Sequence, residues 1–185
     1  MTIFENKKLE RDTFRKLRDG ISLNQRENVE KNVRIYIDSF IKGYKNFGYI
    51  AIYWPLKNEV DIRSLKKKFN LALPRCEAKK ELLFYPWDDK PLTKDFEGIL
   101  SPNNSFSLSH KEISMILVPC LSVDRNLIRL GYGGGYFDKL RRDKNWRKVP
   151  CIGVLTSNCV SKIPLARAEW DIPLSGFITE KEIFV

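Results

Sequence analysis

Histidine, cysteine and long apolar runs are all scarce in this sequence of 185 residues. The one histidine is His110, and the four cysteines, at 76, 120, 151 and 159, form no CxxC pair. Because a structural zinc site needs four clustered sulfur and nitrogen ligands, the sequence argues against one. No apolar run approaches the roughly 20 residues of a membrane-spanning helix, and the charged N-terminus has no signal-peptide core. We therefore expect a cytoplasmic protein with reduced thiols and no membrane partner.

Basic residues outnumber acidic residues by 33 to 23, which gives a net charge of +10. Such a surface attracts polyanions without identifying them. Nucleic acid, a nucleotide or a substrate with several carboxylates would each fit. Hydrophobic residues make up 43% of the chain, which is too many for a disordered protein. Since no repeat is present and the length suits one unit, we expect residues 1–185 to form a single domain.

Helical and strand-like patterns alternate along the chain. A capping box of Ser22 and Gln25 begins one helix, whose apolar stripe runs from Val29 to Ile41. Further helical patterns cover residues 5–19, 62–69 and 137–142. Strands are expected at 49–54, 113–118, 149–155 and 177–179, with short apolar runs at 71–73 and 82–85 and a loop over 88–111. This alternation predicts a three-layer α/β/α fold on an open, mainly parallel sheet.

The most informative segment is RLGYGGGYFD, residues 129–138, in which positions 131, 133, 134 and 135 are glycine. Glycine is entropically costly inside a helix or strand, and it suits backbone that turns or approaches a ligand. The place of this run between a buried strand and a helix favours a phosphate-binding loop over a flexible turn. Tyr136 breaks the GxGxxG spacing and no GK[ST] follows, so neither the dinucleotide nor the Walker A pattern is present.

Three acidic residues are candidates for this site. Asp138 has two equal interpretations, as an acid favoured at a helix start or as a carboxylate that faces magnesium. Glu59 and Asp61 both follow the strand 49–54. Asp61 is best explained as the N-cap of the next helix. Glu59 has no such structural role, and acids beyond strand ends in α/β folds often meet ligands, so Glu59 is the better functional candidate.

Aromatic residues gather near the expected strand ends, and they form either core or a stacking wall for a flat heterocycle: Tyr53, Trp54, Phe84, Tyr85 and Trp87. The basic helix 5–19 is either a solvated face or a clamp for phosphates. Cys120 is a weak candidate nucleophile, because no base can be assigned beside it.

Several segments, taken together, resemble the 5-formyltetrahydrofolate cyclo-ligase family, whose members are also called 5,10-methenyltetrahydrofolate synthetases. The matching segments follow the family's order over almost the whole chain. The most specific is Ile116–Leu140, ILVPCLSVDRNLIRLGYGGGYFDKL. The others are the helix with Lys7, Arg11 and Arg18, then YWPLKNEVDI, LPR at 73–75, LLFYPW, and EWDIPLSGFITE at 169–180.

The resemblance implies an enzyme that depends on ATP and Mg²⁺ and converts 5-formyltetrahydrofolate into 5,10-methenyltetrahydrofolate, with ADP and phosphate as the other products. The formyl oxygen takes the γ-phosphoryl group, and N10 then closes the ring. We expect a monomer that acts on this small molecule, with or without a polyglutamate tail, on a Rossmann-like scaffold similar to that of sugar-phosphate isomerases and CoA-transferases.

The same resemblance assigns roles to individual residues. The ATP-binding set is Lys7, Arg11, Arg129, Leu130, Gly131, Tyr132, Gly133, Gly134, Gly135, Tyr136 and Phe137. The folate-binding set is Trp54, Glu59 and the loop residues from Tyr132 to Tyr136. The magnesium carboxylates are Asp138 and Asp171, and the catalytic residues are Arg129, Tyr136 and Asp138. Under this interpretation Asp138 faces the metal.

Two positions depart from the family pattern. Glu10 replaces the leucine of a K-x-x-L-R motif, which leaves Lys7 and Lys8 as alternatives for one phosphate contact. Gly134 stands where some members carry Lys or Arg, and either Lys139 or Arg125 could compensate.

Two other functions fit parts of the sequence. The basic charge would suit a nucleic-acid-binding domain, although no recognised motif accompanies it, and we expect no nucleic-acid partner. A sugar-phosphate or acyl-CoA enzyme would suit the scaffold, because a fold does not determine function.

Overall fold

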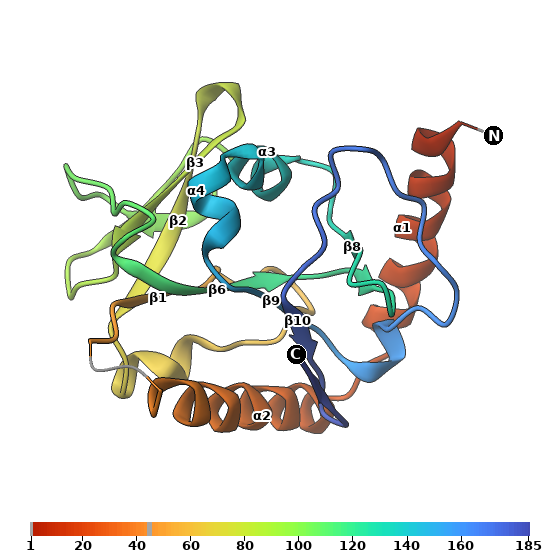
Figure 1. Cartoon of the computed structure of the whole chain (residues 1–185), viewed down its shortest axis with the longest axis horizontal. Coiled ribbons are helices and arrows are strands. Elements are labelled where there is room, and N and C mark those ends of the chain that lie inside the picture. Colours follow the sequence, from red (N-terminus) through yellow and green to blue (C-terminus); the bar gives the residue numbers. More distant parts are fainter. Residues whose placement is uncertain (1, 44–45) are drawn as a thin grey trace.

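A seven-stranded sheet with helices on both faces organises the computed structural model, which describes residues 2–43 and 46–185 (Figure 1). The strand order is β11-β10-β9-β6-β1-β2-β3. The five strands from β10 to β2 are parallel, and the two edge strands are antiparallel to their neighbours. The strands are β1 (Tyr49–Ala51), β2 (Leu71–Glu77), β3 (Glu81–Pro86), β6 (Ile113–Pro119), β9 (Cys151–Val154), β10 (Gly176–Ile178) and β11 (Ile183–Phe184). The predicted α/β fold with a mainly parallel sheet is confirmed.

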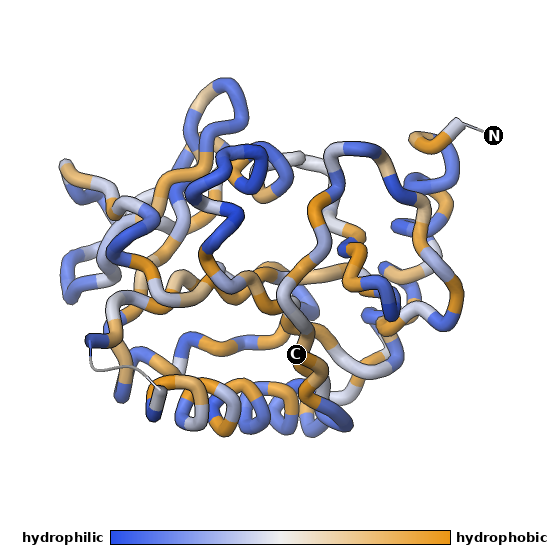
Figure 2. Tube along the Cα trace, viewed as in Figure 1, coloured by the Kyte–Doolittle hydropathy of each residue, from blue (hydrophilic) through white to orange (hydrophobic). Residues whose placement is uncertain are grey.

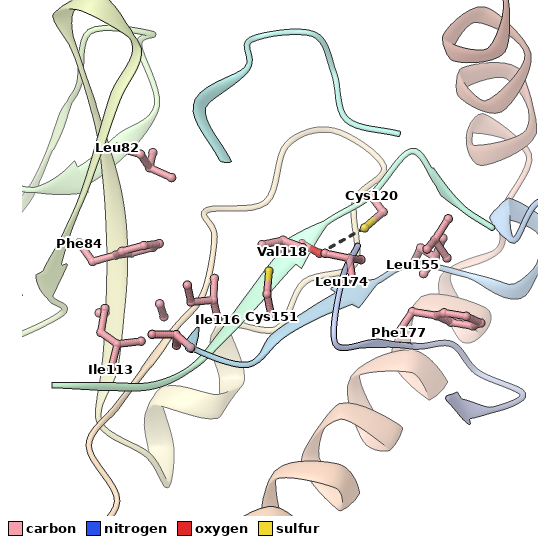
Figure 3. Packing of buried hydrophobic residues seen from close by; sticks show 14 of the residues in the cluster. Leu82, Phe84, Ile113, Ile116, Val118, Cys120, Cys151, Leu155, Leu174 and Phe177 are labelled. Carbon is pink, nitrogen blue, oxygen red and sulfur yellow. Dashed lines mark hydrogen bonds between the residues drawn. The ribbon is translucent and has the colours of Figure 1, made fainter. Parts of the chain in front are cut away.

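Side chains alternate between the two faces of the sheet, as the pleat of a strand requires. On β6, Met115 and Leu117 belong to one buried cluster, whereas Ile116 and Val118 belong to the other. Figure 3 shows part of the second cluster. Figure 2 shows that the central strands are mostly hydrophobic. The continuous apolar run in the sequence therefore reflects a strand that is covered on both faces.

Helix α2 (Leu23–Ile41) covers the first face with Val29, Val33 and Ile37, which are fully buried. Its predicted capping box is present, because the Ser22 hydroxyl accepts the Gln25 N–H and the Gln25 side chain accepts the Ser22 N–H. Helices α3 (Tyr136–Arg142) and α4 (Lys144–Lys148) pack on the other face. The three layers follow from these two sets of contacts.

Helix α1 (Ile3–Asp19) lies at the carboxyl edge of the parallel strands instead of on a face (Figure 1). It contacts β8 (Arg129–Leu130), which follows β6, and the short helix η3 (Ser157–Cys159), which follows β9. A capping box of Thr2 and Glu5 begins α1, two residues before the predicted start. Within the described ranges, none of the helices has both the length and the apolarity that crossing a bilayer requires.

The order of the parallel strands reverses between β1 and β6. From β1 the chain moves to β2 on one side, and from β6 it moves to β9 and β10 on the other side. In open α/β sheets, ligands bind outside the carboxyl ends of the strands at such a switch point. The segments that leave β1 and β6 at this edge carry Glu59 and the glycine loop, respectively.

The prediction that residues 88–111 form only a loop is wrong. Strands β4 (Leu92–Lys94) and β5 (Leu100–Pro102) pair there as an antiparallel hairpin. The Asp95 carboxylate holds its turn by accepting the N–H groups of Glu97 and Ile99. Two more short strands, β7 (Ser122–Val123) and β8, also pair. Strands of two or three residues are too short to show an alternating pattern.

The predicted helix 62–69 is a short 3₁₀ helix, η1 (Arg63–Lys67), and Asp61 is not its N-cap, because Ile62 occupies that position. The Asp61 side chain instead accepts the N–H of Arg63, two residues on, and binds the Arg63 guanidinium. A carboxylate that accepts the N–H two residues ahead forms an Asx turn. The Asp61 carboxylate thus has its hydrogen bonds from Arg63 and does not cap the helix. A second short helix, η2 (Ala78–Lys80), joins β2 to β3.

Helix α2 offers a matched test of this packing. Ile37 is fully buried against the sheet, whereas Ile35 on the same helix is 51% exposed. We expect Ile37→Ala to lower the free energy of unfolding by about 2–5 kcal/mol, because it leaves a cavity. Ile35→Ala should change it by less than about 0.5 kcal/mol. Urea unfolding of both variants checks this, and equal losses would contradict the described burial.

Candidate active site

A cleft of about 720 Å³ opens at the carboxyl edge of the sheet, a size that suits a small-molecule site. Helix α1, the segment after β1, the glycine loop, the start of α3 and the segment 168–171 all line it. Every predicted site residue lies on its wall: Lys7, Arg11, Trp54, Glu59, all residues from Arg129 to Asp138, and Asp171. The fold therefore brings these residues together, while the ligand of each remains a prediction.

The glycine loop carries the chain from β8 directly into α3. Gly133 has φ +106° and Gly135 has φ +78°, values that residues with a side chain rarely adopt. A Cβ atom on Gly131 would lie 3.2 Å from the Arg129 guanidinium. A side chain would therefore be strained at Gly133 and Gly135 and would crowd Arg129 at Gly131, and the main chain itself lines the cleft at these positions.

Lys7 and Arg11 project from one face of α1, because they are four residues apart. The Arg11 Nε donates to the carbonyl oxygen of Gly131 at 2.9 Å, so α1 is tied to the loop. The buried Lys7 ammonium binds the Asp171 carboxylate, whereas Lys8 is exposed and lies outside the cleft. Of the two alternatives, Lys7 is the one that faces the site. Glu10 points elsewhere and accepts the N–H of Ala166 at 2.9 Å.

The two carboxylates predicted to bind magnesium each pair with a cation. Asp138 Oδ1 lies 3.0 Å from Arg129, and Asp171 Oδ2 accepts from Lys7 and from the N–H of Ala168. No donor in the described ranges bonds to Asp138 Oδ2 or Asp171 Oδ1. Both side chains also line one small pocket together with Arg129 and Arg141.

The two carboxylates suit a magnesium ion whose other ligands are substrate phosphates and water. The described part of the chain has no group of three or more acidic, histidine or cysteine ligands, so it offers no complete protein cage. Magnesium is usually held by one or two carboxylates together with substrate phosphates and water. Two carboxylates with free oxygens beside a cationic loop fit that requirement.

Arg141, which was not predicted, links the segment that carries Asp171 to the helix that carries Asp138. It is buried on α3, three residues after Asp138, and its guanidinium donates to the carbonyl oxygens of Ile172 and Pro173 at 3.0 and 2.9 Å. These bonds fix the segment that carries Asp171 against the helix that carries Asp138. Nothing local in the sequence marks a buried arginine whose partners lie about 30 residues away.

Glu59 sits in a tight turn after β1. Its Oε2 accepts the N–H of Leu56 at 2.7 Å, and its Oε1 lies 4.0 Å from Arg18. Oε1 is buried and has no hydrogen-bond donor among the described residues. Burial raises the pKa of Glu59 above its ordinary value, although the neighbouring Tyr132 hydroxyl, the Leu56 N–H and the charge of Arg18, in that order, oppose this shift. A buried acceptor without a donor is unusual, and here the nearest side-chain hydroxyl is that of Tyr132, so Oε1 can accept from a ligand that enters beside Tyr132.

Arg18 joins Glu59 to the glycine loop. Its guanidinium donates to the Tyr132 hydroxyl and lies 5.1 Å from the centroid of the Tyr132 ring. Burial also raises the pKa of Tyr132, so this phenol stays protonated at neutral pH. The sequence suggested Arg18 only as part of the basic helix, because its contact with Tyr132 spans 114 residues.

Some of the aromatic residues form core, and one has the position expected of a stacking wall for a flat ligand. Phe84 is fully buried in the core. Trp54 lines the cleft, packs edge-on against Trp87 with centroids 6.0 Å apart, and has the Arg63 guanidinium 4.5 Å from its ring. Tyr53 is buried beneath the cleft and donates to the carbonyl of Val60. Only Trp54 among these three has a wall position with some exposure.

The structure weakens two of the earlier alternatives. Burial raises the pKa of Cys120 to about 12, so its thiol is protonated at neutral pH and cannot act as a thiolate nucleophile. Arg125 lies outside the cleft, where it pairs with Glu182. Lys139 does line the cleft, as does Lys80, which the sequence did not suggest.

The hairpin β4–β5 contributes a further residue that was not predicted. Glu97, in its turn, accepts a hydrogen bond from the Tyr136 hydroxyl and lines the cleft. This contact anchors the aromatic ring that closes the glycine loop. Because a loop was expected over residues 88–111, Glu97 was not considered as a site residue.

Residues 3–180 match the model of the 5-formyltetrahydrofolate cyclo-ligase family. The chain is 28% identical over 175 residues to a 5-formyltetrahydrofolate cyclo-ligase of Haemophilus influenzae, covering 89% of this chain and 92% of that one. It is 24% identical over 164 residues to a protein of the same name from Mycoplasma pneumoniae, with the same coverage.

Solved structures agree with this. The structure of Aquifex aeolicus 5,10-methenyltetrahydrofolate synthetase superimposes with a TM-score of 0.77 at 28% identity, covering 96% of this chain and 91% of that one. The synthetase of Mycoplasma pneumoniae shares the fold with a TM-score of 0.71 at 22% identity, over 95% and 99% of the two chains. The resemblance seen in the sequence is confirmed, and the chain belongs to the 5-formyltetrahydrofolate cyclo-ligase family.

Proposed function

We propose that this cleft converts 5-formyltetrahydrofolate into 5,10-methenyltetrahydrofolate at the expense of ATP, which leaves as ADP and phosphate. One observation carries the proposal: a single cleft joins a cation-lined glycine loop to a buried carboxylate beside a tryptophan. The first feature suits a triphosphate and the second suits a pterin. The family match favours this reaction over the nucleic-acid, sugar-phosphate and acyl-CoA alternatives.

The proposed chemistry explains why both ligands share one site. A formamide oxygen is a poor leaving group, so the ring cannot close on it directly. Transfer of the γ-phosphoryl group to that oxygen makes it part of a phosphate. N10 then attacks the formyl carbon and loses its proton, the new C–N bond forms, and the C–O bond breaks as phosphate departs. Such a reaction depends mainly on positioning and charge stabilisation.

The chain's basic residues supply that stabilisation. Arg11 and Arg129 both lie against Gly131 of the glycine loop, and Lys7 lies one turn of α1 from Arg11. Their positive charges and the N–H groups of the loop would stabilise the negative charge of a phosphoryl group during its transfer. Asp138 and Asp171 would hold magnesium, which neutralises phosphate charge when bound.

The other wall of the cleft suits the folate. Glu59 Oε1 lacks a hydrogen-bond donor among the described residues, and the N–H groups of a pterin can supply one. Trp54 offers an aromatic surface in the same cleft. Tyr132 belongs to the phosphate loop, and its hydroxyl is bonded to Arg18, which lies 4.0 Å from Glu59, so it borders both ligands.

The reaction itself is tested by near-ultraviolet absorbance of the methenyl product. Purified protein is mixed with 5-formyltetrahydrofolate, with and without Mg-ATP. We expect the absorbance to grow only when Mg-ATP is present. Product formation at an equal rate without ATP, or a flat trace from folded protein in its presence, would contradict the proposal.

Asp138 tests the magnesium assignment. Asp138→Asn removes the charge and keeps the size of the side chain, and we expect kcat to fall by about 100-fold or more. Asp12→Asn, on the exposed face of α1 outside the cleft, is the control and should keep full activity. Urea unfolding verifies that both variants fold. Near-normal turnover of the folded Asp138→Asn variant would remove Asp138 from the metal site.

Glu59 predicts a pH dependence. Because burial raises its pKa, Glu59 gains a proton at a higher pH than an exposed glutamate and then accepts hydrogen bonds less well. The KM for 5-formyltetrahydrofolate should therefore rise as the pH falls from about 8 to about 5, while the KM for ATP changes little. Glu59→Gln should raise the folate KM at every pH and abolish the trend.

The exposed Glu27 on α2 supplies the control for this measurement, since Glu27→Gln should keep the wild-type profile. An unchanged pH profile in Glu59→Gln would show that another group is responsible for the trend. Equal loss of folate and ATP affinity in that variant would contradict the assignment of Glu59 to the folate.

A further inference from the structure

Two exposed aromatic side chains meet at the mouth of the cleft. Phe4 on α1 is 66% exposed and Trp170 is 41% exposed. Their ring centroids lie 6.3 Å apart, with the ring planes tilted by 32°, and both residues line the cleft. Single exposed aromatics are common on protein surfaces. A pair that faces a ligand cleft while adding little to the core is a candidate contact for a flat ligand.

Helix α1 aligns this pair with the phosphate-facing cations. Phe4, Lys7 and Arg11 are spaced three and four residues apart, which places them on one face of the helix. At 1.5 Å per residue, Phe4 lies about 10 Å along the axis from Arg11. Arg11 contacts the glycine loop, Lys7 contacts Asp171, and Phe4 contacts Trp170.

Trp170 is held near Lys7 and Arg142. It directly precedes Asp171, the partner of Lys7, and the Arg142 guanidinium lies 5.8 Å from its ring centroid, within the range of a cation–π contact. The Arg141 bonds to Ile172 and Pro173 fix this segment to α3. The ring is therefore anchored on the phosphate side of the cleft, apart from Trp54, which packs against Trp87.

We propose that Phe4 and Trp170 bind the base of the nucleoside triphosphate by stacking. This inference rests on the proposed function, which places the triphosphate at the glycine loop. A nucleotide with its phosphates at Arg11 and Lys7 extends along α1 and brings its base to the aromatic pair. The folate ring then occupies the other aromatic surface, where Trp54 lies beside the Glu59 acceptor.

Inorganic tripolyphosphate separates base contacts from phosphate contacts, because it has the phosphates and no base. The variants are Phe4→Ala, Trp170→Ala and Trp170→Phe, and the last keeps an aromatic ring. Phe106→Ala is the matched control, since Phe106 is 87% exposed and lies outside the cleft. For each variant the KM for ATP, the KM for 5-formyltetrahydrofolate and the inhibition constant of tripolyphosphate are measured by absorbance.

We expect each alanine substitution in the pair to raise the KM for ATP by about tenfold, the loss typical of a removed base–aromatic stack. Trp170→Phe should retain most of the affinity, and Phe106→Ala should retain all of it. The KM for 5-formyltetrahydrofolate and the inhibition by tripolyphosphate should stay at the wild-type values in all four variants.

Three results would overturn the inference. An unchanged KM for ATP in both alanine variants removes the pair from the nucleotide site. A rise in the folate KM alone assigns the pair to the folate. Equal weakening of ATP and tripolyphosphate shows a disturbed phosphate site. Product formation without ATP by the wild-type enzyme would instead overturn the proposed function, so the two failures are distinguishable.

Discussion

The main chain of residues 131–135 links β8 to α3 through glycines, two of which adopt a backbone conformation that other residues rarely reach. Gly133 and Gly135 need positive φ, and a Cβ atom on Gly131 would press on the Arg129 guanidinium. Arg129 can then reach both Asp138 and the carbonyl of Pro119. Arg11 is held by the carbonyl of Gly131, which fixes the position of α1. The geometry of the whole cleft therefore depends on this short run of glycines.

Paired charges complete the cleft. Lys7 pairs with Asp171, Arg129 with Asp138, and Arg18 lies near Glu59. Leaving a buried charge without a partner is costly, and these three cations each have a carboxylate nearby, whereas Arg11 binds the carbonyl oxygen of Gly131. The same side chains are those that a triphosphate, magnesium and a pterin require. Under the proposed function, the pairs that support the folded cleft also provide its ligand contacts.

Much of this arrangement could be predicted from local sequence. The glycine run and the position of Glu59 after a strand end indicated two parts of the cleft wall, whereas Lys7, Arg11 and Asp171 were assigned only through the resemblance to the family. The remaining features depend on contacts between distant segments. Arg141 bonds carbonyl groups 31 and 32 residues away, and Glu97 reaches Tyr136 from a hairpin that the sequence pattern did not reveal. Such contacts leave no periodic signal, and strands of two or three residues are too short to produce one.

The transfer of the formyl oxygen is the central step of the proposed reaction, and it can be followed with an isotope. 5-Formyltetrahydrofolate labelled with ¹⁸O in the formyl group is converted in the presence of Mg-ATP, and the released phosphate is analysed by mass spectrometry. If the oxygen attacks the γ-phosphate, each phosphate released carries one labelled atom. Unlabelled phosphate, with the ¹⁸O recovered in water, would show that the oxygen leaves without being phosphorylated and would contradict the account.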